Sequence, residues 1–157
     1  MMPGTLMGKA DFVIRTAILG DAPTVGLLTS ELGYPDDRAD SADRLGRVLA
    51  SPGHTVLVAE TAQLTVIGWV HVFSAVRVES DAFAELGGLV VAKNWRAKGV
   101  GARLVAAADR WALDNGNHKL RIRSRTERSE AHGFFERLGF VDRKTQRVFE
   151  RPLAGDP

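Results

Sequence analysis

Cysteine is absent from this 157-residue sequence, and several kinds of site are excluded with it. A disulfide framework, a thiolate nucleophile and a cysteine-ligated zinc ion all require that residue. The four histidines are scattered along the chain and do not form the HExxH spacing of a zinc-binding helix. We therefore expect neither disulfides nor a metal site.

Long apolar runs are also missing. No stretch approaches the roughly 18 apolar residues of a membrane span, and the first residues contain no apolar run of signal-peptide length. We expect a cytoplasmic protein with no membrane partner. The length suits one domain with a buried core, so residues 1–157 are predicted to form a single domain, with residues 1–10 disordered.

Charge of either sign is moderate overall, with a formal net charge of +2, but it is unevenly distributed. Residues 1–88 carry 6 Lys or Arg against 11 Asp or Glu, whereas residues 89–157 carry 15 against 8. Such an asymmetry predicts that the C-terminal half binds an anion and that the N-terminal half meets a cation. The alternative is that two solvated faces merely differ in charge.

The hydrophobic pattern predicts an α/β (α+β) fold. Alternating or β-branched apolar residues mark strands, and apolar residues at helical spacing mark helices. The predicted strands span residues 12–17, 55–59, 66–76, 85–92 and 119–124, with a final pair around 140–141 and 147–149. The predicted helices span about residues 21–32, 45–49, 100–114 and 129–138, with Asp21 as the N-cap of the first. Gly87 and Gly88 are poor strand formers, so we expect a bulge or a close approach by a ligand there.

One turn has the composition of a phosphate cradle. Between a predicted strand and a predicted helix lies Arg96-x-x-Gly99-x-Gly101, where unpaired backbone N–H groups meet the positive end of a helix dipole. Anions bind at such helix starts, glycines allow a close approach, and Arg96 and Lys98 add charge-assisted contacts. A dinucleotide fingerprint fits less well, because Leu104 stands where a third small residue is needed. A P-loop is excluded because the chain has no Gly-Lys-Ser/Thr.

Two longer segments carry a family resemblance. The first is Leu89-Val-Val-Ala-Lys-Asn-Trp-Arg-Ala-Lys-Gly-Val-Gly-Ala-Arg-Leu104, with the pattern Arg/Gln-x-x-Gly-x-Gly/Ala after a strand. The second is Glu130-Ala-His-Gly-Phe-Phe-Glu-Arg-Leu-Gly-Phe140, similar to the pattern A-x-x-F-Y-x-x-x-G-F. Taken together, with one predicted strand between them, they resemble the GNAT superfamily of N-acetyltransferases.

The resemblance implies a GNAT fold, a mixed, mostly antiparallel central sheet flanked by about four helices. The sheet would splay at an acyl-CoA cleft between the strand that ends at Val91 and the strand of residues 119–124. Acetyl-CoA would be the acyl donor, with its pantetheine arm bonded like an added strand and its pyrophosphate in the glycine turn. The implied cofactor-binding residues are Leu89, Val90, Val91, Arg96, Ala97, Lys98, Gly99, Val100, Gly101, Ala102 and Phe135.

The second motif departs from the family at one position. Phe135 stands where the family often has a tyrosine whose hydroxyl protonates the departing thiolate. A thiol with a pKa of about 8.5 is a tolerable leaving group, so losing this acid would slow turnover by about 10²- to 10⁴-fold without abolishing it. Tyr34, the one tyrosine present, or Ser124 would substitute if either reaches the sulfur. The alternative function is a non-catalytic acyl-CoA-binding sensor or regulatory domain.

An ammonium acceptor must lose a proton before it attacks a thioester, so a base is needed. Glu85 is the first candidate, because it begins the strand that leads to the turn and resembles acidic residues at this place in some relatives. The alternative is that Glu85 is an exposed strand-end residue. Glu79 and His71 are weaker candidates, and His132 is interpreted as a packing or cofactor contact. A backbone N–H of Val90 or a neighbour would stabilise the oxyanion.

The acceptor is predicted to be a cationic amine of a small molecule or peptide. The acidic segment of residues 36–43 lies where the resemblance places substrate-covering helices. The four arginines between residues 121 and 128 fit the 3′-phosphate of coenzyme A, a nucleic acid, or no ligand. Nucleic acid is not expected, because no aromatic residue is interleaved with them to stack bases. The apolar strand of residues 66–76 leaves room for a homodimer.

Overall fold

The computed structural model describes residues 11–31, 38–124 and 126–155. The chain divides into two compact units, Met1–Ile122 and Arg123–Pro157. Within the described residues, no helix is long and apolar enough to cross a membrane.

The first unit contains a five-stranded sheet in the order β1-β2-β3-β4-β5. Its strands are β1 (Phe12–Thr16), β2 (His54–Thr61), β3 (Val66–Ala75), β4 (Phe83–Val91) and β5 (Leu120–Ile122). Its helices are η1 (Leu19–Asp21), α2 (Ala22–Ser30), α3 (Arg38–Ala50), η2 (Lys93–Trp95) and α4 (Val100–Asp114). Neighbouring strands are antiparallel except β4 and β5, which are parallel. The predicted mixed, mostly antiparallel sheet is confirmed.

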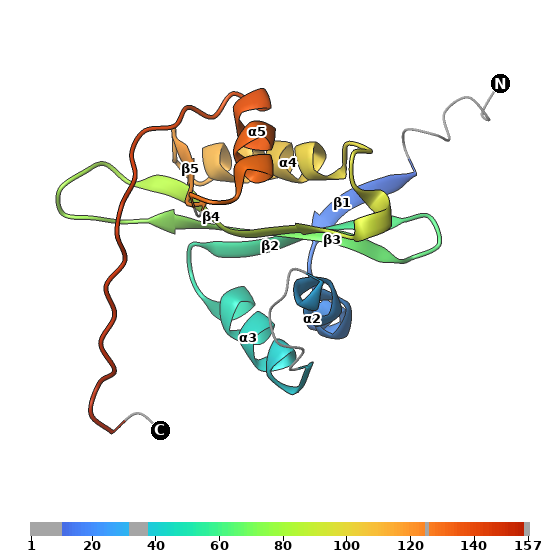
Figure 1. The fold of residues 1–157 in the computed structure, drawn as a ribbon. Coiled ribbons are helices and arrows are strands. Elements are labelled where there is room, and N and C mark those ends of the chain that lie inside the picture. Colours follow the sequence, from blue (N-terminus) through green and yellow to red (C-terminus); the bar gives the residue numbers. More distant parts are fainter. Residues whose placement is uncertain (1–10, 32–37, 125, 156–157) are drawn as a thin grey trace. The chain divides into compact units, whose positions relative to one another are not determined.

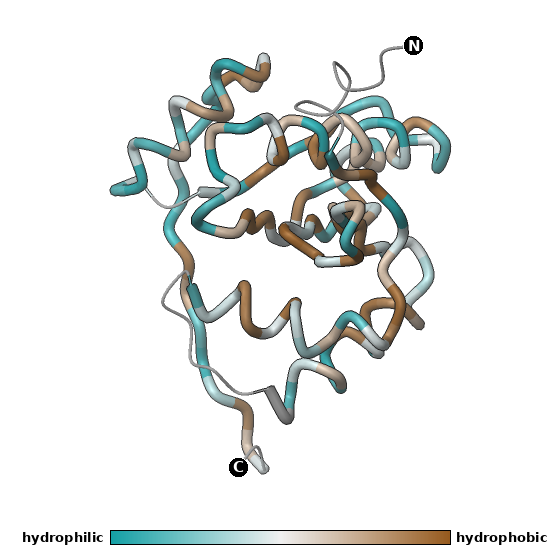
Figure 2. Tube along the Cα trace, turned by 90° about the vertical axis from the view of Figure 1, so that its right-hand side faces the viewer, coloured by the Kyte–Doolittle hydropathy of each residue, from teal (hydrophilic) through white to brown (hydrophobic). Residues whose placement is uncertain are grey.

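Helices cover both faces of this sheet (Figure 1). On one face lies α4, whose residues Val100, Leu104 and Ala108 recur at helical spacing and are buried. Gly68 of β3 lets this helix come close, since a Cβ there would lie only 3.1 Å from Leu104 Cδ1. The opposite face is covered by α2 and α3, which contact β3 and β2 (Figure 1). In Figure 2 the hydrophobic residues gather along the central strands, between these two layers.

One extra residue interrupts the pairing of β4 with β3. His71 pairs with Gly88, whereas the next residue, Val72, pairs with Leu86, so Gly87 has no partner on β3. This arrangement is a β-bulge, and it confirms the interruption predicted from the paired glycines. The bulge changes which side of the strand each following peptide group faces.

The pairing of β4 with β5 is short. Only Ala84, Glu85 and Leu86 have partners on β5. Among the described residues, no strand pairs with the other backbone side of residues 87–91, which we call the open edge of β4. The strands therefore separate at the bulge, between the two elements where the family resemblance implied a splay. The strand predicted over residues 119–124 is correspondingly shorter, at Leu120–Ile122.

The start of the first long helix is fixed by an ion network. Asp21 occupies the N-cap position of α2, as predicted, but its carboxylate does not cap that helix. It accepts hydrogen bonds from Ile18 N at 2.8 Å and from both Nη groups of Arg15 at 2.9 Å. Arg15 also donates to Glu60 on β2 at 3.0 and 3.1 Å. The hydrogen bonds from Arg15 hold the pKa values of the Asp21 and Glu60 carboxyls below their ordinary values. The same bonds connect β1 and β2 to the segment that begins α2.

The second unit contains helix α5 (Ser129–Arg137), as predicted. The ring of Phe135 makes edge contacts with Phe134 and Phe140, with centroids 5.3 and 5.7 Å apart. Residues 140–153 form neither helix nor strand, so the predicted strand pair around 140–141 and 147–149 is wrong. A strand requires a hydrogen-bonded neighbour as well as β-branched and aromatic residues. Val148 and Phe149 are instead 86% and 84% exposed.

Candidate active site

The predicted phosphate cradle is an exposed turn followed by an uncapped helix start. Ala97 and Gly99 have positive φ angles of 61° and 85°, so the chain bends sharply before α4 begins at Val100. No side chain caps this helix, and Arg103 N donates to Gly99 O at 3.1 Å. The N–H groups of residues 100–102 precede that bond, so they have no helical acceptor. They lie at the positive end of the α4 dipole, where an anion is stabilised.

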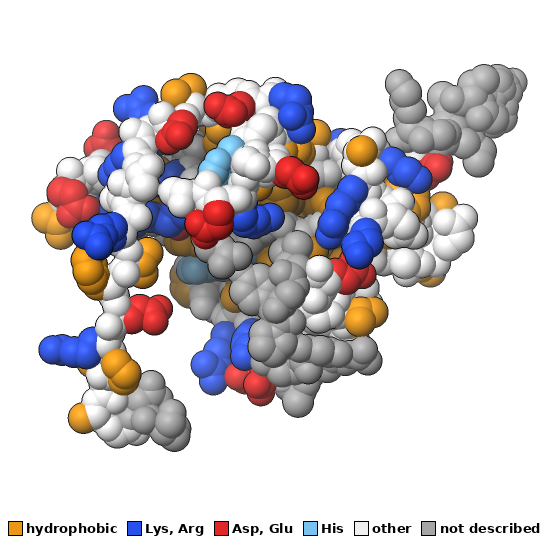
Figure 3. All heavy atoms as spheres, viewed as in Figure 1, with side chains coloured by type: hydrophobic (Ala, Val, Ile, Leu, Met, Phe, Trp, Pro, Cys, Tyr) orange, Lys and Arg blue, Asp and Glu red, His pale blue; other side chains and the backbone are white. Residues whose placement is uncertain are grey.

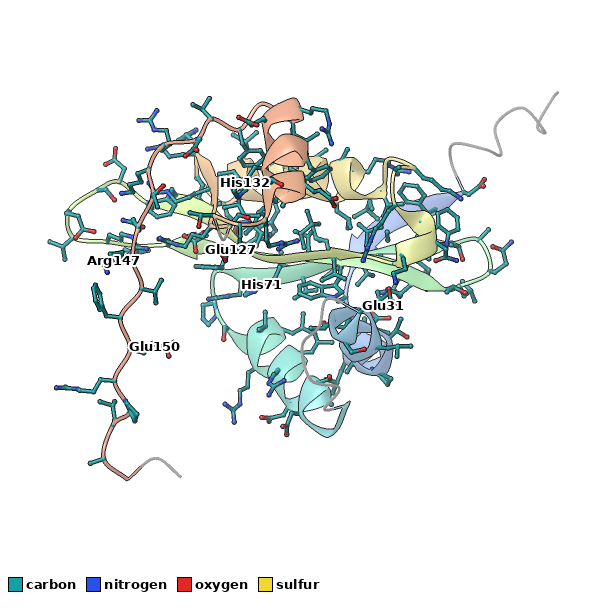
Figure 4. The ribbon with its side chains drawn as sticks, viewed as in Figure 1. Glu31, His71, Glu127, His132, Arg147 and Glu150 are labelled. Atoms are coloured by element: carbon teal, nitrogen blue, oxygen red, sulfur yellow. The ribbon has the colours of Figure 1, made fainter. Side chains whose placement is uncertain are left out.

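Four contacts hold this turn against its surroundings. Arg96 Nε donates to the carbonyl of Val91 at 3.1 Å, which fixes the side chain at the end of β4 and leaves both Nη groups outside that bond. The Lys98 ammonium lies 5.4 Å from the centroid of Trp95. Glu31, at the end of α2 and labelled in Figure 4, accepts from the first backbone N–H of η2 at 3.2 Å. Trp95 also packs edge-on against Phe12, with centroids 6.4 Å apart. Two cations and several amides therefore converge on one exposed turn.

The alternation of β4 decides which of its amides face the open edge. The backbone N–H of Ala92 donates to Ile67 O, so it points toward β3. Backbone N–H groups alternate in direction along an antiparallel strand, so that of Val90 also points toward β3. Those of Leu89 and Val91 point to the open edge. An amide offered to a ligand there belongs to Leu89 or Val91. Of the expected oxyanion donors, Val90 or a neighbour, the geometry therefore favours the neighbours. The side chain of Val90 is buried, at 3% exposure.

Glu85 lies in the middle of a paired strand, not at an exposed strand end. It is half-buried, with Phe73 opposite on β3 and Arg121 opposite on β5. Directly opposite residues point to the same face, so Glu85 shares the face of Phe73, away from α4. The Arg121 guanidinium lies 4.2 Å from the centroid of Phe83. A carboxylate on this face stands beside the point where β4 and β5 separate.

Two histidines on the same face are hydrogen-bonded to each other. His54 Nδ1 and His71 Nε2 are 3.0 Å apart, and the His54 ring stacks on Phe73 with centroids 4.9 Å apart. The His71 ring lies against Gly87 of the bulge, where a Cβ would overlap its Nδ1 atom. Burial, and secondarily the charge of His54, lowers the pKa of His71 from 6.5 to about 4. His71 is therefore neutral at physiological pH (labelled in Figure 4).

Trp69 extends this face toward the end of β4. Its ring covers Gly88, where a Cβ would lie 2.7 Å from Cη2. Its Nε1 is buried and has no hydrogen-bond partner in the part of the chain that the structure describes. A buried donor without an acceptor costs about 1–3 kcal/mol, so a polar ligand atom that reached it would be stabilised.

The acidic segment is only partly described. Tyr34 and residues 36–37 lie outside the described residues, so the structure does not place the predicted acid or the first two aspartates. Further along α3 the acidic side chains form exposed i,i+4 pairs with arginines (Figure 3). The pairs are Asp40 with Arg44 at 3.7 Å and Asp43 with Arg47 at 3.1 Å. The α3 carboxylates that the structure describes are therefore partly neutralised by their own helix.

The remaining candidates belong to the second unit or lie outside the described residues. Phe135, Ser124 and His132 are in the second unit, whose placement relative to the turn and to Glu85 is not determined. Of the arginines between residues 121 and 128, Arg123 donates to Gln146 at 2.9 Å, and Arg125 lies outside the described residues. No group of three or more His, Asp or Glu side chains suited to a metal ion occurs among the described residues.

His54 and Trp69 were missed by the sequence reasoning. Counting back from the turn at residues 62–64 would place His54 opposite Val72, on the other face of the sheet. The register shift between Ala59 and Glu60 brings His54 opposite Phe73 and diagonal to His71, and the sequence carries no signal of that shift. The β4 side of the contact was visible, as the two glycines that leave room for the rings of His71 and Trp69. Trp69, His71 and Phe73 share one face because side chains alternate between the two faces along β3.

Comparisons with known proteins agree with this geometry. The model of the acetyltransferase (GNAT) family matches residues 23–140. A curated relative, aminoglycoside N(6′)-acetyltransferase type 1 of Stenotrophomonas maltophilia, is 31% identical over 148 residues, covering 89% of this chain and 93% of that protein.

Solved structures share the fold. An aminoglycoside antibiotic 6′-N-acetyltransferase of Acinetobacter baumannii has a TM-score of 0.78 at 16% identity, covering 91% of this chain and 99% of that chain. The acetyltransferase AAC(6′)-Iy, in complex with the bisubstrate analog CoA-S-monomethyl-acetylneamine, has a TM-score of 0.76 at 20% identity, covering 90% and 99%. On the family match and the curated relative together, this chain is an acetyltransferase enzyme and belongs to the GNAT family.

Proposed function

We propose that this enzyme transfers the acetyl group of acetyl-CoA to the 6′-amine of an aminoglycoside. The observation that carries the proposal is the open edge of β4, which leads directly into the uncapped start of α4. An extended thioester arm and a diphosphate need these two features in this order. The acceptor class is supported by the curated relative, which is named for aminoglycoside N(6′)-acetylation.

The cofactor fits the residues that are present. The amides of Leu89 and Val91 face the open edge and would bond the pantetheine arm like an added strand. The amides of residues 100–102 would hold the pyrophosphate, with Arg96 and Lys98 adding charge-assisted contacts. Acetyl-CoA supplies the activated acetyl group when it is bound.

Glu85 is the proposed base. An alkylammonium has a pKa of about 10, so at neutral pH a carboxylate is needed to accept its proton, directly or through one water. Glu85 points to the face covered by α2 and α3 and lies two residues before the bulge. The amides of the open edge lie just beyond the bulge, so the attacking nitrogen and the thioester oxygen would each find their partner within one short stretch of β4. A Leu89 or Val91 amide would stabilise the negative charge that develops on that oxygen.

No tyrosine acid is available in α5, because Phe135 occupies its position. The departing thiolate has an ordinary pKa of about 8.5, so it leaves without protonation at a rate lower by about 10²- to 10⁴-fold than with a positioned acid. Tyr34 remains the proposed substitute. Tyr34→Phe tests this role, because it removes only the hydroxyl.

The decisive experiment measures release of the coenzyme A thiol with a chromogenic thiol reagent. The protein contributes no background, because it has no cysteine. The acceptors are a matched pair of aminoglycosides, one with a 6′-amine and one with a 6′-hydroxyl, together with polyamines and peptide N-termini. Turnover with the 6′-amine and none with the 6′-hydroxyl is the expected result. Tight coenzyme binding with no turnover on any amine would instead support the sensor alternative.

A further inference from the structure

Two imidazoles connect the β4 bulge to the start of β2. His71 Nε2 lies 3.0 Å from His54 Nδ1, and these strands pair so that the two rings are diagonal neighbours on one face. The rings are stacked, with centroids 5.2 Å apart and planes inclined by 26°. Phe73 packs on both rings, at 4.9 Å from His54 and 5.4 Å from His71. The pair is therefore held in one orientation by packing on the ring faces.

The two nitrogens of His71 have different surroundings. Nε2 faces His54, whereas Nδ1 faces Gly87, the unpaired residue of the bulge. No described residue forms a hydrogen bond with Nδ1. Glu85 lies diagonally across β4 on the same face, since Phe73 is opposite Glu85 and His71 is opposite Gly88. One end of the histidine pair thus shares a face with Glu85, and the other end, His54, is half-buried and in contact with solvent.

We propose that His71 and His54 form a proton relay, which carries the proton of the acceptor ammonium from Glu85 to solvent. The inference rests on the proposed function, because the proton to be carried is the one that the amine loses before it attacks the thioester. Both histidines are positioning and relay groups in this scheme, and neither touches the acetyl group.

The protons balance along the path. An ammonium N–H bond breaks and an O–H bond forms on Glu85. This O–H bond then breaks as its proton passes to a bridging water, which gives up one of its own protons to form an N–H bond at His71 Nδ1. His71 Nε2–H, which donates to His54 Nδ1 in the resting state, passes its proton to that atom. His54 releases its own Nε2 proton to water. The net change is one free amine and one proton in solution, and exchange with water restores the starting tautomers.

The charged groups around the pair suit a relay of neutral rings. From β2, His54 contacts His71, and from β4, Glu85 is its diagonal neighbour on the same face. Helix α2 has no charged residue between Ala22 and Ser30, and the α3 carboxylates pair with arginines of the same helix. Burial keeps the pKa of His71 near 4, so the ring is neutral at neutral pH and carries one proton. The relay uses the tautomer with that proton on Nε2, toward His54, which leaves Nδ1 able to accept one.

Two variants of His54 separate a relay from a packing role. His54→Phe keeps a ring stacked on Phe73 and removes both nitrogens, whereas His54→Ala leaves a half-exposed space that imidazole from the buffer can fill. We expect both to lower kcat by about 10²-fold, the lower limit for a positioned proton-transfer group. Added imidazole should restore His54→Ala and leave His54→Phe unchanged. His118→Ala, at an exposed histidine, is the control and should match the wild type with or without imidazole.

A second readout does not depend on activity. In ¹⁵N-resolved titrations of the protein without ligands, His71 should titrate near pH 4 in the wild type. In His54→Phe its pKa should rise, because the charge of His54 is removed while burial remains. A His71 pKa that His54→Phe leaves unmoved would overturn the coupling of the two rings.

The outcomes are distinguishable. A fall in kcat that imidazole reverses only in His54→Ala supports the relay, with coenzyme A affinity by calorimetry and Tm confirming an intact fold. Unchanged kcat in both variants, or a fall that imidazole does not reverse in His54→Ala, overturns it. A wild-type enzyme that acetylates no aminoglycoside removes the proposed function, and the relay with it.

Discussion

Replacing Gly99 by alanine tests the proposed phosphate-binding turn through a conformational cost that the structure defines. The residue has a φ of +85°, and a Cβ built there meets no atom within 4 Å. The cost is therefore conformational, about 1–2 kcal/mol for an L-residue in the left-handed region. For a chain of this size, that loss lowers Tm by about 2–8 °C.

The same strain should weaken coenzyme A binding. A turn that relaxes away from φ +85° no longer aims the amides of residues 100–102 at one point. Loss of one hydrogen bond to a charged phosphate is worth about 1.5–3 kcal/mol, which raises Kd about 10- to 150-fold. Calorimetric titration with coenzyme A measures this change.

Gly116→Ala is the matched control for this experiment. Gly116 follows α4 with a φ of +81°, and a Cβ there also meets no atom within 4 Å. Both variants should lose similar stability, but only Gly99→Ala should lose coenzyme A affinity. If the two variants melt alike and bind coenzyme A alike, the diphosphate is held elsewhere and the reasoning fails.

Three other substitutions probe the base, the histidine pair and the ion network. Glu85→Gln should lower kcat about 10²- to 10⁴-fold and leave coenzyme A affinity unchanged. The control Glu79→Gln, in the exposed loop before β4, should leave kcat unchanged. Equal kcat values for the two variants would exclude Glu85 as the base. His71 binds its proton more weakly when folded, with a pKa of about 4 against 6.5, so its contribution to stability is complete above pH 6.5 and is lost as pH falls toward 4. The wild-type Tm should therefore fall more over this window than that of His71→Gln, and parallel curves would contradict the burial. Asp21→Asn, in the buried network with Arg15, should lower the free energy of unfolding in urea by about 1.5–3 kcal/mol. Asp114→Asn, in the exposed pair with Arg110, should lower it by less than about 0.5 kcal/mol. Similar losses would show that the Arg15 network adds no stability.

The glycine turn and the uncapped start of α4 were predictable because the signal is local. Gly99, Gly101 and Arg96 lie within six residues, so composition and order alone indicate a helix start after a sharp turn. The predicted bulge was equally local, since two adjacent glycines weaken a strand wherever it pairs. Both features appear in the structure at the predicted residues.

Features that depend on pairing between distant segments were harder to predict. The contact between His54 and His71 depends on how β2 and β3 are aligned. The strands predicted at residues 140–149 did not form, because a strand needs a neighbour to pair with and composition does not reveal whether one is present. Val148 and Phe149 have strand-forming side chains, yet they are exposed without a ladder. Strand propensity shows only that a segment can be extended; pairing with a neighbouring strand decides whether it forms a β-strand.

The bulge at Gly87 places both proposed substrate sites on one short strand. Below it, Ala84 N donates to Lys119 O, so even-numbered peptide groups face β5. Above it the alternation is inverted, and the amides of Leu89 and Val91 take the open edge while Glu85 keeps its place on the acceptor face. Without the extra residue, either the carboxylate or the following side chains would change face, since one residue of slip reverses a whole strand. The irregular peptide therefore lets the proposed base on one face and the proposed oxyanion donors on one edge lie within about five residues of each other, some 17 Å at most along a strand. Because His71 lies against that same glycine, the residue that sets the geometry of β4 also positions the histidine pair on the face of the proposed base.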